Sequence, residues 1–216
     1  MTTLGFIGLG IMGTPMAGHL LAAGHTVYLH TRNAVPQALL DAGGQACSHA
    51  REVAQKADII FCCVGNDDDL RSVTLGADGA FAGMKPGAIF VDHTTASADI
   101  ARELSAAALA KGLQFIDAPV SGGQAGAQNG LLTVMCGGDA DAFETIKPVA
   151  MAFSRAVTLL GASGAGQLAK MVNQICIAGL VQGLSEAIAF GQKAGLDMAQ
   201  VLDVLGTGAA PVSYTH

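Results

Sequence analysis

The segment Gly5-Phe6-Ile7-Gly8-Leu9-Gly10-Ile11-Met12-Gly13 decides the fold of this chain. It places the pattern Gly-x-Gly-x-x-Gly between a short apolar run, residues 4–7, and a helical pattern, residues 12–23. In such a unit the first glycine permits a tight turn, the second leaves room for a pyrophosphate, and the third lets helix and strand pack closely. The helix N-terminus adds amide donors and a positive dipole. The segment predicts dinucleotide binding; a glycine-rich turn that packs without a ligand is the alternative.

Short runs of β-prone residues alternate with longer helical patterns through most of the chain. The expected strands are residues 4–7, 26–30, 59–64, 88–92 and 114–117, with 132–136 and 156–160 as further members. The clearest later helix, residues 98–111, is rich in alanine and follows Ser97 as its N-cap. Parallel strands need a crossover connection, which is normally a helix. The order predicts a Rossmann-type, doubly wound α/β domain over residues 1–162, with a mainly parallel sheet.

The pattern changes at a glycine-rich stretch, residues 161–166. An unbroken helical sequence, residues 167–194, follows and far exceeds the mean helix length of about 11 residues. Asp197 then provides an N-cap for a shorter helix, residues 198–205. We interpret residues 163–216 as an interdomain helix and the start of an all-helical second domain. Because the long helix is apolar around most of its surface, we expect a C-terminally truncated chain or a helix swapped with another copy, and a homodimer or homotetramer when the chain is complete.

Composition narrows the classes of protein and partner. The 216 residues are 51% hydrophobic and 13% charged, which excludes an intrinsically disordered chain. The net charge is -6 and no basic run occurs, so we expect no nucleic-acid partner. The six histidines lack metal-ligand spacing, and we expect no metal site. Five cysteines without a CxxC pair suit a reducing cytoplasm, and the sequence shows neither a signal peptide nor the run of about 18 apolar residues that a membrane helix needs.

The end of the second expected strand, His30-Thr31-Arg32-Asn33, bears on the choice of cofactor. An NAD-binding protein usually has an acidic residue here, about 20 residues beyond the fingerprint, to hold the ribose hydroxyls. Arg32 instead offers a planar cation with forked donors that suit a 2′-phosphate, and Thr31 and Asn33 add a hydroxyl and an amide. The sequence favours NADP, with NAD as the second candidate. A solvated surface arginine is the alternative interpretation.

A polar stripe interrupts the long apolar helix. Gln167, Lys170, Asn173 and Gln174 lie three or four residues apart, so they share one helix face. The stripe must either meet solvent or line a cleft, and the residues alone leave both interpretations open.

Small and acidic residues follow other expected strands. Ser121-Gly122-Gly123 can hold a carboxylate with a hydroxyl and two backbone amides, at the sheet edge where parallel sheets bind ligands; a tight turn explains these residues equally well. Residues 92–97 also end a strand, and a helix N-cap explains Ser97 without any ligand. We interpret the three aspartates at residues 67–69 as a solvated cluster at a helix start.

Three separated motifs occur in a fixed order: residues 5–13, Asp117-Ala118-Pro119-Val120-Ser121-Gly122-Gly123, and Gly164-Ala165-Gly166 followed by Lys170 and Asn173. Together, over residues 4–208, they resemble the β-hydroxyacid dehydrogenase family. This family includes 3-hydroxyisobutyrate dehydrogenase, tartronate semialdehyde reductase and glyoxylate/succinic semialdehyde reductase. Many members have Asn four residues after the lysine, whereas this chain has Gln174; its Lys-x-x-Asn-Gln order is similar to the tartronate semialdehyde reductase subgroup.

The resemblance implies roles for individual residues. Lys170 would be the catalytic lysine, acting as general acid and base. Substrate would be bound by Ser121, Gly122, Gly123, Asn173 and Gln174. The cofactor would be held by Gly8, Leu9, Gly10, Ile11, Met12, Gly13, Thr31, Arg32, Asn33, Val64 and Thr95. The expected reaction is hydride transfer between NAD(P) and a small carboxylate-bearing hydroxy acid or semialdehyde; a non-catalytic dinucleotide-binding or interaction module is the alternative.

Overall fold

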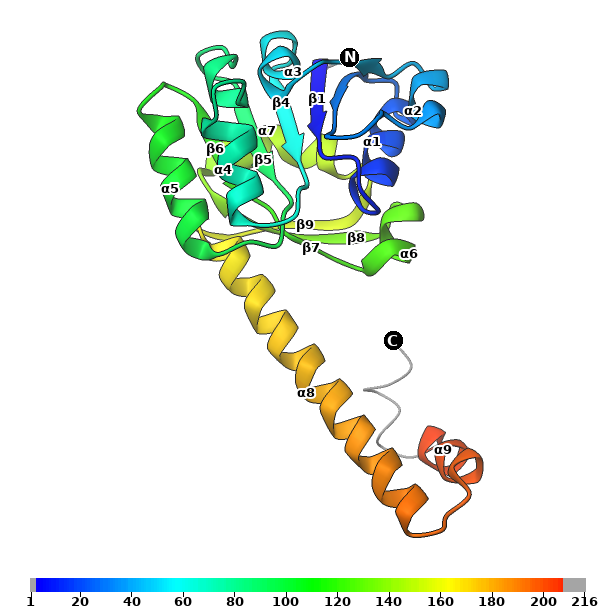
Figure 1. The fold of residues 1–216 in the computed structure, drawn as a ribbon. Helices are drawn as coiled ribbons and strands as arrows, with labels where there is room; N and C mark the ends of the chain where they lie inside the picture. Colours follow the sequence, from blue (N-terminus) through cyan, green and yellow to red (C-terminus); the bar gives the residue numbers. More distant parts are fainter. Residues whose placement is uncertain (1–2, 208–216) are drawn as a thin grey trace. The chain divides into compact units, whose positions relative to one another are not determined.

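A computed structural model describes residues 3–207 of the chain (Figure 1). The chain divides into two compact units, Met1–Lys170 and Met171–His216. In its described part, the first unit contains one nine-stranded sheet. Of the predicted second domain, residues 208–216 lie outside the described part of the chain.

The strands of the first unit are β1 (Thr3–Ile7), β2 (Thr26–His30), β3 (Gln45–Ala46), β4 (Ile59–Cys62), β5 (Ile89–Asp92), β6 (Gln114–Asp117), β7 (Val120–Ser121), β8 (Leu132–Gly138) and β9 (Ser154–Gly161). Its helices are α1 (Gly13–Ala22), α2 (Gln37–Asp41), α3 (Ala50–Lys56), α4 (Asp67–Leu75), the 3-10 helix η1 (Ala80–Ala82), α5 (Ala98–Leu109), α6 (Gly123–Gln128) and α7 (Ala140–Ala150). α8 (Ala165–Lys193) begins in the first unit and ends in the second, which also holds α9 (Met198–Gly206).

Six strands form a parallel array in the order β3-β2-β1-β4-β5-β6. β8 runs antiparallel to β6 and β7, and β9 pairs parallel with β8. This arrangement confirms the predicted doubly wound, mainly parallel sheet, and each predicted strand is present with small differences at its ends. β3 and β7 have 2 residues each, too few for an alternating sequence pattern to reveal.

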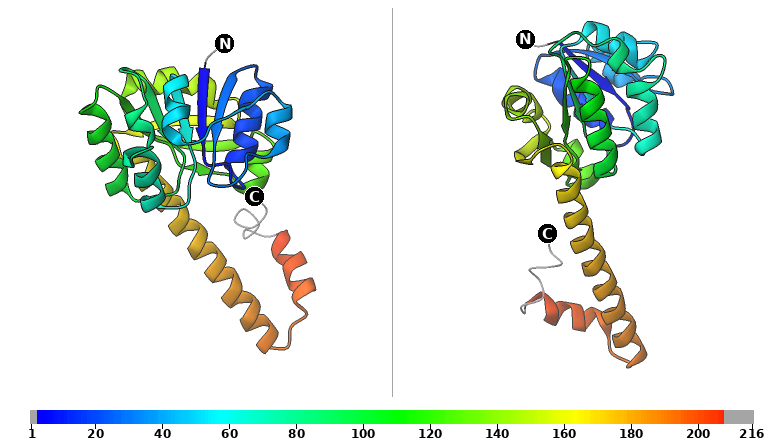
Figure 2. Two further views of the ribbon diagram at one scale, coloured as in Figure 1. Left: turned by 45° about the horizontal axis from the view of Figure 1, so that its top comes forward. Right: turned by 90° about the vertical axis from the view of Figure 1, so that its left-hand side faces the viewer.

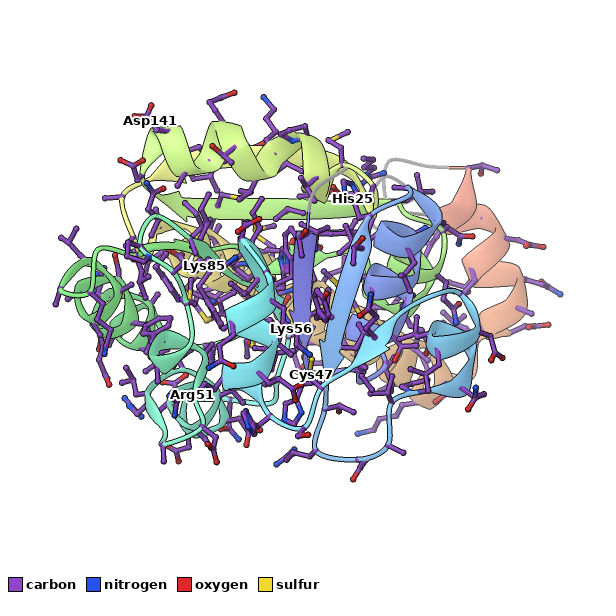
Figure 3. The ribbon with its side chains drawn as sticks, turned by 90° about the horizontal axis from the view of Figure 1, so that it is seen from above. His25, Cys47, Arg51, Lys56, Lys85 and Asp141 are labelled. Atoms are coloured by element: carbon purple, nitrogen blue, oxygen red, sulfur yellow. The ribbon has the colours of Figure 1, made fainter. Side chains whose placement is uncertain are left out.

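Two apolar clusters cover the two faces of the sheet, because successive side chains of a strand point to opposite sides. Phe6 of β1 belongs to the cluster that also contains side chains of α1 and α7. Its neighbour Ile7 belongs to the cluster that contains side chains of α3, α4 and α5. Helices lie on both sides of the sheet (Figure 2), and Figure 3 places Asp141 of α7 and Arg51 of α3 on opposite sides. The core therefore consists of two layers that hold the strand ends in fixed positions.

The segment after β5 is buried and includes a histidine. His93 is 1% exposed, and its ring stacks on Phe61 at 5.6 Å between centroids and meets Phe153 edge-on at 5.4 Å. Its Nδ1 lies 2.6 Å from the carbonyl oxygen of Ala118. Burial lowers the pKa of His93 to about 4, so the ring is neutral in the folded protein at neutral pH.

In the second unit, α8 carries exposed apolar side chains, with Val172, Ile175 and Phe190 at 62%, 71% and 73%. By length and composition, α8 is the one helix among residues 3–207 that could cross a membrane, a test that the core helix of a water-soluble protein also passes. Asp197 caps α9 as predicted, since its Oδ1 accepts a hydrogen bond of 2.9 Å from the amide of Ala199.

Replacing His93 with Gln should change how stability depends on pH. The folded-state pKa, about 4, lies below the ordinary 6.5, so the unfolded chain binds a proton that the folded chain does not. The stability that neutral His93 contributes, measured as the difference from His93→Gln, is therefore fully present above pH 6.5 and is lost as the pH falls toward 4. Urea unfolding of both proteins should show a relative loss of about 2 kcal/mol between pH 7 and pH 5.

Taking the difference between the two proteins removes the contribution of Asp92. Burial raises the pKa of Asp92 to about 7, so ionisation of this carboxyl group lowers the stability of the folded protein as the pH rises. This effect is the same in both proteins. Parallel stability curves for the two proteins would show that His93 titrates normally.

Candidate functional site

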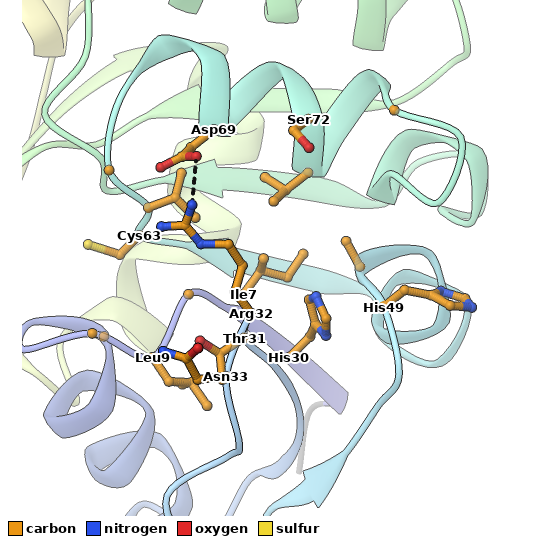
Figure 4. A pocket seen from close by; sticks show the side chains of 18 of the residues that line it. Ile7, Leu9, His30, Thr31, Arg32, Asn33, His49, Cys63, Asp69 and Ser72 are labelled. Atoms are coloured by element: carbon orange, nitrogen blue, oxygen red, sulfur yellow. Dashed lines mark hydrogen bonds and ion pairs between the residues drawn. The ribbon is translucent and has the colours of Figure 1, made fainter.

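A cavity of about 720 Å³ opens at the carboxyl ends of β1, β2 and β4 (Figure 4). The strand order reverses here, because β1 lies between β2 and β4. Such a crevice is where doubly wound sheets bind nucleotides. The lining residues are Ile7 to Gly13, His30 to Asn33, His49, Ala50, Cys63 to Gly65, Asp69, Ser72, Val73 and Gly76 to Asp78.

The three fingerprint glycines differ in what their missing side chains would contact. Gly8 has a φ of +91, and a Cβ there would overlap the carbonyl group of Cys63. A Cβ at Gly13 would overlap the carbonyl oxygen of Gly8. At Gly10, by contrast, a Cβ would meet no atom within 4 Å. The fold itself requires Gly8 and Gly13, whereas Gly10 leaves open space inside the cavity for a ligand.

The N-terminus of α1 is open to an anion. The helix has no side-chain N-cap and no acidic residue in its first turn. Within residues 3–207, the backbone amides of Leu9, Gly10 and Ile11 donate no hydrogen bond to protein. These donors line the cavity together with the positive end of the helix dipole. The site therefore fits the pyrophosphate of a dinucleotide.

Thr31, Arg32 and Asn33, which the sequence predicts as cofactor-binding residues, line the cavity at the end of β2. The Arg32 side chain is 83% exposed, and one of its terminal nitrogens lies 3.3 Å from Oδ1 of Asp69, which reaches across from α4 (Figure 4). Sequence spacing does not reveal this pair, because the two residues are 37 positions apart. Arg32 can therefore hold an anion at the rim, but a carboxylate already contacts it.

The interpretation of residues 67–69 as solvated needs correction. Asp67 accepts two hydrogen bonds from Ser97, 2.9 Å from its amide and 2.6 Å from its hydroxyl. Asp69 contacts Arg32, and Asp68, with a side chain 94% exposed, pairs with Arg71. The first turn of α4 is therefore tied both to the cavity rim and to the start of α5.

Val64 and Thr95 differ in position, although both were expected to bind cofactor. Val64 lines the cavity, and its amide donates a hydrogen bond of 3.0 Å to Oγ1 of Thr94. Thr95 is exposed and does not line the cavity.

Two buried aspartates end adjacent strands. Asp92 of β5 and Asp117 of β6 are register partners, and both are 0% exposed. Asp117 accepts hydrogen bonds from the amides of Gly164, at 2.7 Å to Oδ1, and Gln167, at 3.0 Å to Oδ2. Asp92 accepts one at 2.9 Å from the amide of Thr94. Burial raises the pKa of both carboxyl groups, that of Asp92 to about 7.

Lys170 lies in the second turn of α8 and is 8% exposed. Burial lowers the pKa of its ammonium group, and no carboxylate among residues 3–207 lies within ion-pair distance of it. Gln167, one turn earlier, is 0% exposed. Burial of an amine favours its neutral form, which is the form that can accept a proton.

The remaining predicted substrate residues occupy two other places. Ser121 ends β7, and Gly122 and Gly123, with φ values of +131 and +60, begin α6. None of these three residues, nor Lys170, lines the 720 Å³ cavity. Asn173 and Gln174 belong to the second unit, where the amide of Asn173 donates a 3.0 Å hydrogen bond to Oε1 of Gln174.

Replacing Gly10 with Ala should separate cofactor binding from folding. Because a Cβ at Gly10 meets only open space, the free energy of unfolding should change by less than about 0.5 kcal/mol. A methyl group in the path of a pyrophosphate should nevertheless weaken NADPH and NADH binding at least about tenfold in calorimetric titrations. The matched control, Gly13→Ala, should lose about 1–3 kcal/mol of stability, since its Cβ overlaps backbone. Unchanged cofactor affinity in Gly10→Ala would exclude this loop as the pyrophosphate site.

Comparison with known families and proteins agrees with this geometry. Residues 3–161 match the family model described as the NAD binding domain of 6-phosphogluconate dehydrogenase. Residues 164–215 match the model described as the NAD-binding of NADP-dependent 3-hydroxyisobutyrate dehydrogenase.

Similar individual proteins come from several bacteria. An uncharacterized oxidoreductase of Shewanella frigidimarina is 57% identical, over 97% of this chain and 73% of that protein. The 2-hydroxy-3-oxopropionate reductase of Escherichia coli is 39% identical, over 96% of this chain and 71% of the reductase. The solved structure of Mycobacterium tuberculosis 3-hydroxyisobutyrate dehydrogenase with L-serine has a TM-score of 0.87 at 33% identity, covering 97% of this chain and 72% of that one. The chain therefore belongs to the β-hydroxyacid dehydrogenase family of NAD(P)-dependent oxidoreductases, as its three motifs predicted.

Proposed function

We propose that the chain interconverts a small 3-hydroxy acid and its semialdehyde, prefers NADP to NAD, and uses Lys170 as general acid and base. The observation that carries this proposal is a buried lysine, with no carboxylate of residues 3–207 in ion-pair distance, in the unit that also carries the dinucleotide fingerprint. The bound nicotinamide supplies or accepts the hydride. The protein's own residues must bind the substrate, orient it and move one proton.

Proton transfer is the part that Lys170 performs in this proposal. In the reducing direction its ammonium group gives a proton to the carbonyl oxygen, and in the oxidising direction its neutral amine removes the hydroxyl proton. Burial supports this role because it lowers the pKa of Lys170 and so makes the neutral amine easier to form.

The proposed substrate class rests on donors for a carboxylate. The Ser121 hydroxyl and the amides at Gly122 and Gly123 are suited to this anion, and Asn173 and Gln174 add side-chain amides. The E. coli relative is named for 2-hydroxy-3-oxopropionate, a small carboxylate-bearing semialdehyde, and this name supports the same class here.

Replacing Lys170 with Ala should lower turnover by a factor of about 10² to 10⁴, the usual contribution of a positioned acid or base. NADPH affinity should be retained, because Lys170 does not line the cavity. The measurement is NADPH oxidation with tartronate semialdehyde, glyoxylate and succinic semialdehyde. Lys193→Ala, an exposed lysine in the last turn of the same helix, is the matched control and should leave turnover unchanged. Near-normal turnover of Lys170→Ala would show that Lys170 is not the general acid and base. If the unmodified chain binds NADPH but turns over none of the three substrates, a binding module is favoured.

Replacing Arg32 with Ala should remove the preference for NADP. One charge-assisted contact with the 2′-phosphate stabilises binding by about 1.5–3 kcal/mol, so NADPH should bind about ten- to more than a hundredfold more tightly than NADH before the change and equally afterwards. Asp69→Asn should raise NADPH affinity, by less than about tenfold, because it frees the guanidinium of an exposed ion pair. Calorimetric titration with both cofactors decides: an equal loss for NADPH and NADH in Arg32→Ala would mean that its side chain contacts no phosphate.

A further inference from the structure

The start of α8 is fixed to the sheet by unusually close contacts. A Cβ at Gly166 would overlap the carbonyl oxygen of Met135 in β8, and one at Gly137 would lie 2.8 Å from both the carbonyl oxygen of Ala162 and the amide nitrogen of Ala165. Backbone therefore packs directly on backbone where the helix begins. The first turn of α8 has no room to shift toward β8.

Asp117 provides the first polar anchor for this turn. Its two carboxylate oxygens accept hydrogen bonds from two different amides, those of Gly164 and Gln167. Amides in the first turn of a helix have no partner within the helix. A carboxylate 0% exposed at the end of β6 satisfies two of them here.

Gln167 provides the second anchor, toward the segment that follows β5. Its side-chain amide donates a hydrogen bond of 2.7 Å to the carbonyl oxygen of Thr94, and its Oε1 accepts one of 3.1 Å from the amide of Ala96. Both polar groups of the side chain are used within the interior. Gln167 therefore does not share an open polar face with Asn173 and Gln174, as the stripe in the sequence suggests.

Lys170 follows Gln167 by three residues, so the two side chains leave α8 on the same face. No ion pair among residues 3–207 holds Lys170 in place. We infer that Asp117 and Gln167 are positioning residues for Lys170: they fix the first turns of α8 on the carboxyl ends of β5 and β6 and so keep the ammonium group in its buried position. This inference rests on the proposed role of Lys170 in proton transfer.

Two substitutions remove one anchor each with little change in volume. Asp117→Asn places a side-chain NH₂ group against one of two backbone amides, so one of the hydrogen bonds is lost. Gln167→Met keeps the length of the side chain and removes both of its hydrogen bonds. Asp139→Ala is the matched control, because Asp139 also accepts hydrogen bonds from two first-turn amides, those of Asp141 and Ala142, but in α7.

The test is an NMR titration of the full chain labelled with ¹³C-lysine, with the Lys170 signal assigned from its absence in Lys170→Arg. In the unmodified protein Lys170 should titrate below an exposed lysine. Both Asp117→Asn and Gln167→Met should raise its pKa toward the ordinary value of about 10.4, because a loosened helix start exposes the ammonium group. Removing the negative charge of Asp117 would by itself lower this pKa, so a rise reports lost positioning. Asp139→Ala should leave it unchanged.

Hydrogen exchange of the unmodified protein provides a second measurement that needs no variant. The amides of Gly164 and Gln167 should exchange at least about tenfold more slowly than a first-turn amide that has no acceptor among residues 3–207, such as that of Asp99 in α5. Rapid exchange at both amides, or an unchanged Lys170 titration in Gln167→Met, would overturn the inference. Full turnover by Lys170→Ala would instead refute the proposed catalytic role and leave the titration result standing.

Discussion

Close packing of backbone against backbone at the turn between β1 and α1 governs the geometry of the cofactor cavity. Gly8 and Gly13 leave no space for a side chain, since each would meet a carbonyl group of the protein itself. The turn consequently presents, in one arrangement, amides that have no acceptor among residues 3–207, next to a helix start without a side-chain cap. Gly10, by contrast, has open space where its side chain would lie, within the cavity that these amides face. The packing of the fold thus accounts for Gly8 and Gly13, whereas it leaves Gly10 unexplained unless a ligand fills the space beside it.

A comparable constraint operates at the carboxyl ends of β5 and β6, the last two strands of the parallel array. Asp92 and Asp117 lie side by side in a medium where two negative charges repel strongly. Asp117 receives two amide hydrogen bonds, which favour its ionised form, whereas Oδ2 of Asp92 has no partner among residues 3–207. Burial raises the pKa of Asp92 to about 7, whereas the two amide hydrogen bonds of Asp117 favour the ionised form of the residue that anchors α8.

Features that depend on neighbouring residues could be predicted from the sequence, and features that depend on long-range contacts could not. The fingerprint, the strand pattern and the Ser97 cap are local, and the Oγ of Ser97 does accept the amide of Ile100 at 3.0 Å. Asp117 reaches amides 47 and 50 residues away, so no spacing rule identifies it. Helical periodicity placed Gln167 on the face of Lys170, but periodicity does not say what lies opposite that face. The assignments of Ser121, Thr95, Asn173 and Gln174 remain predictions.

The ion pair between Arg32 and Asp69 makes anion binding at the cavity rim an exchange of partners. A phosphate that reaches Arg32 must displace a carboxylate, so the guanidinium does not go from unpaired to paired. Dissolved salt weakens the initial pair and the final pair together, and the salt dependence of binding should therefore be shallower than one isolated phosphate contact would produce. Because Asp69 shares the first turn of α4 with Asp67, whose carboxylate holds the start of α5, the released carboxylate belongs to a turn that remains tied on its other side.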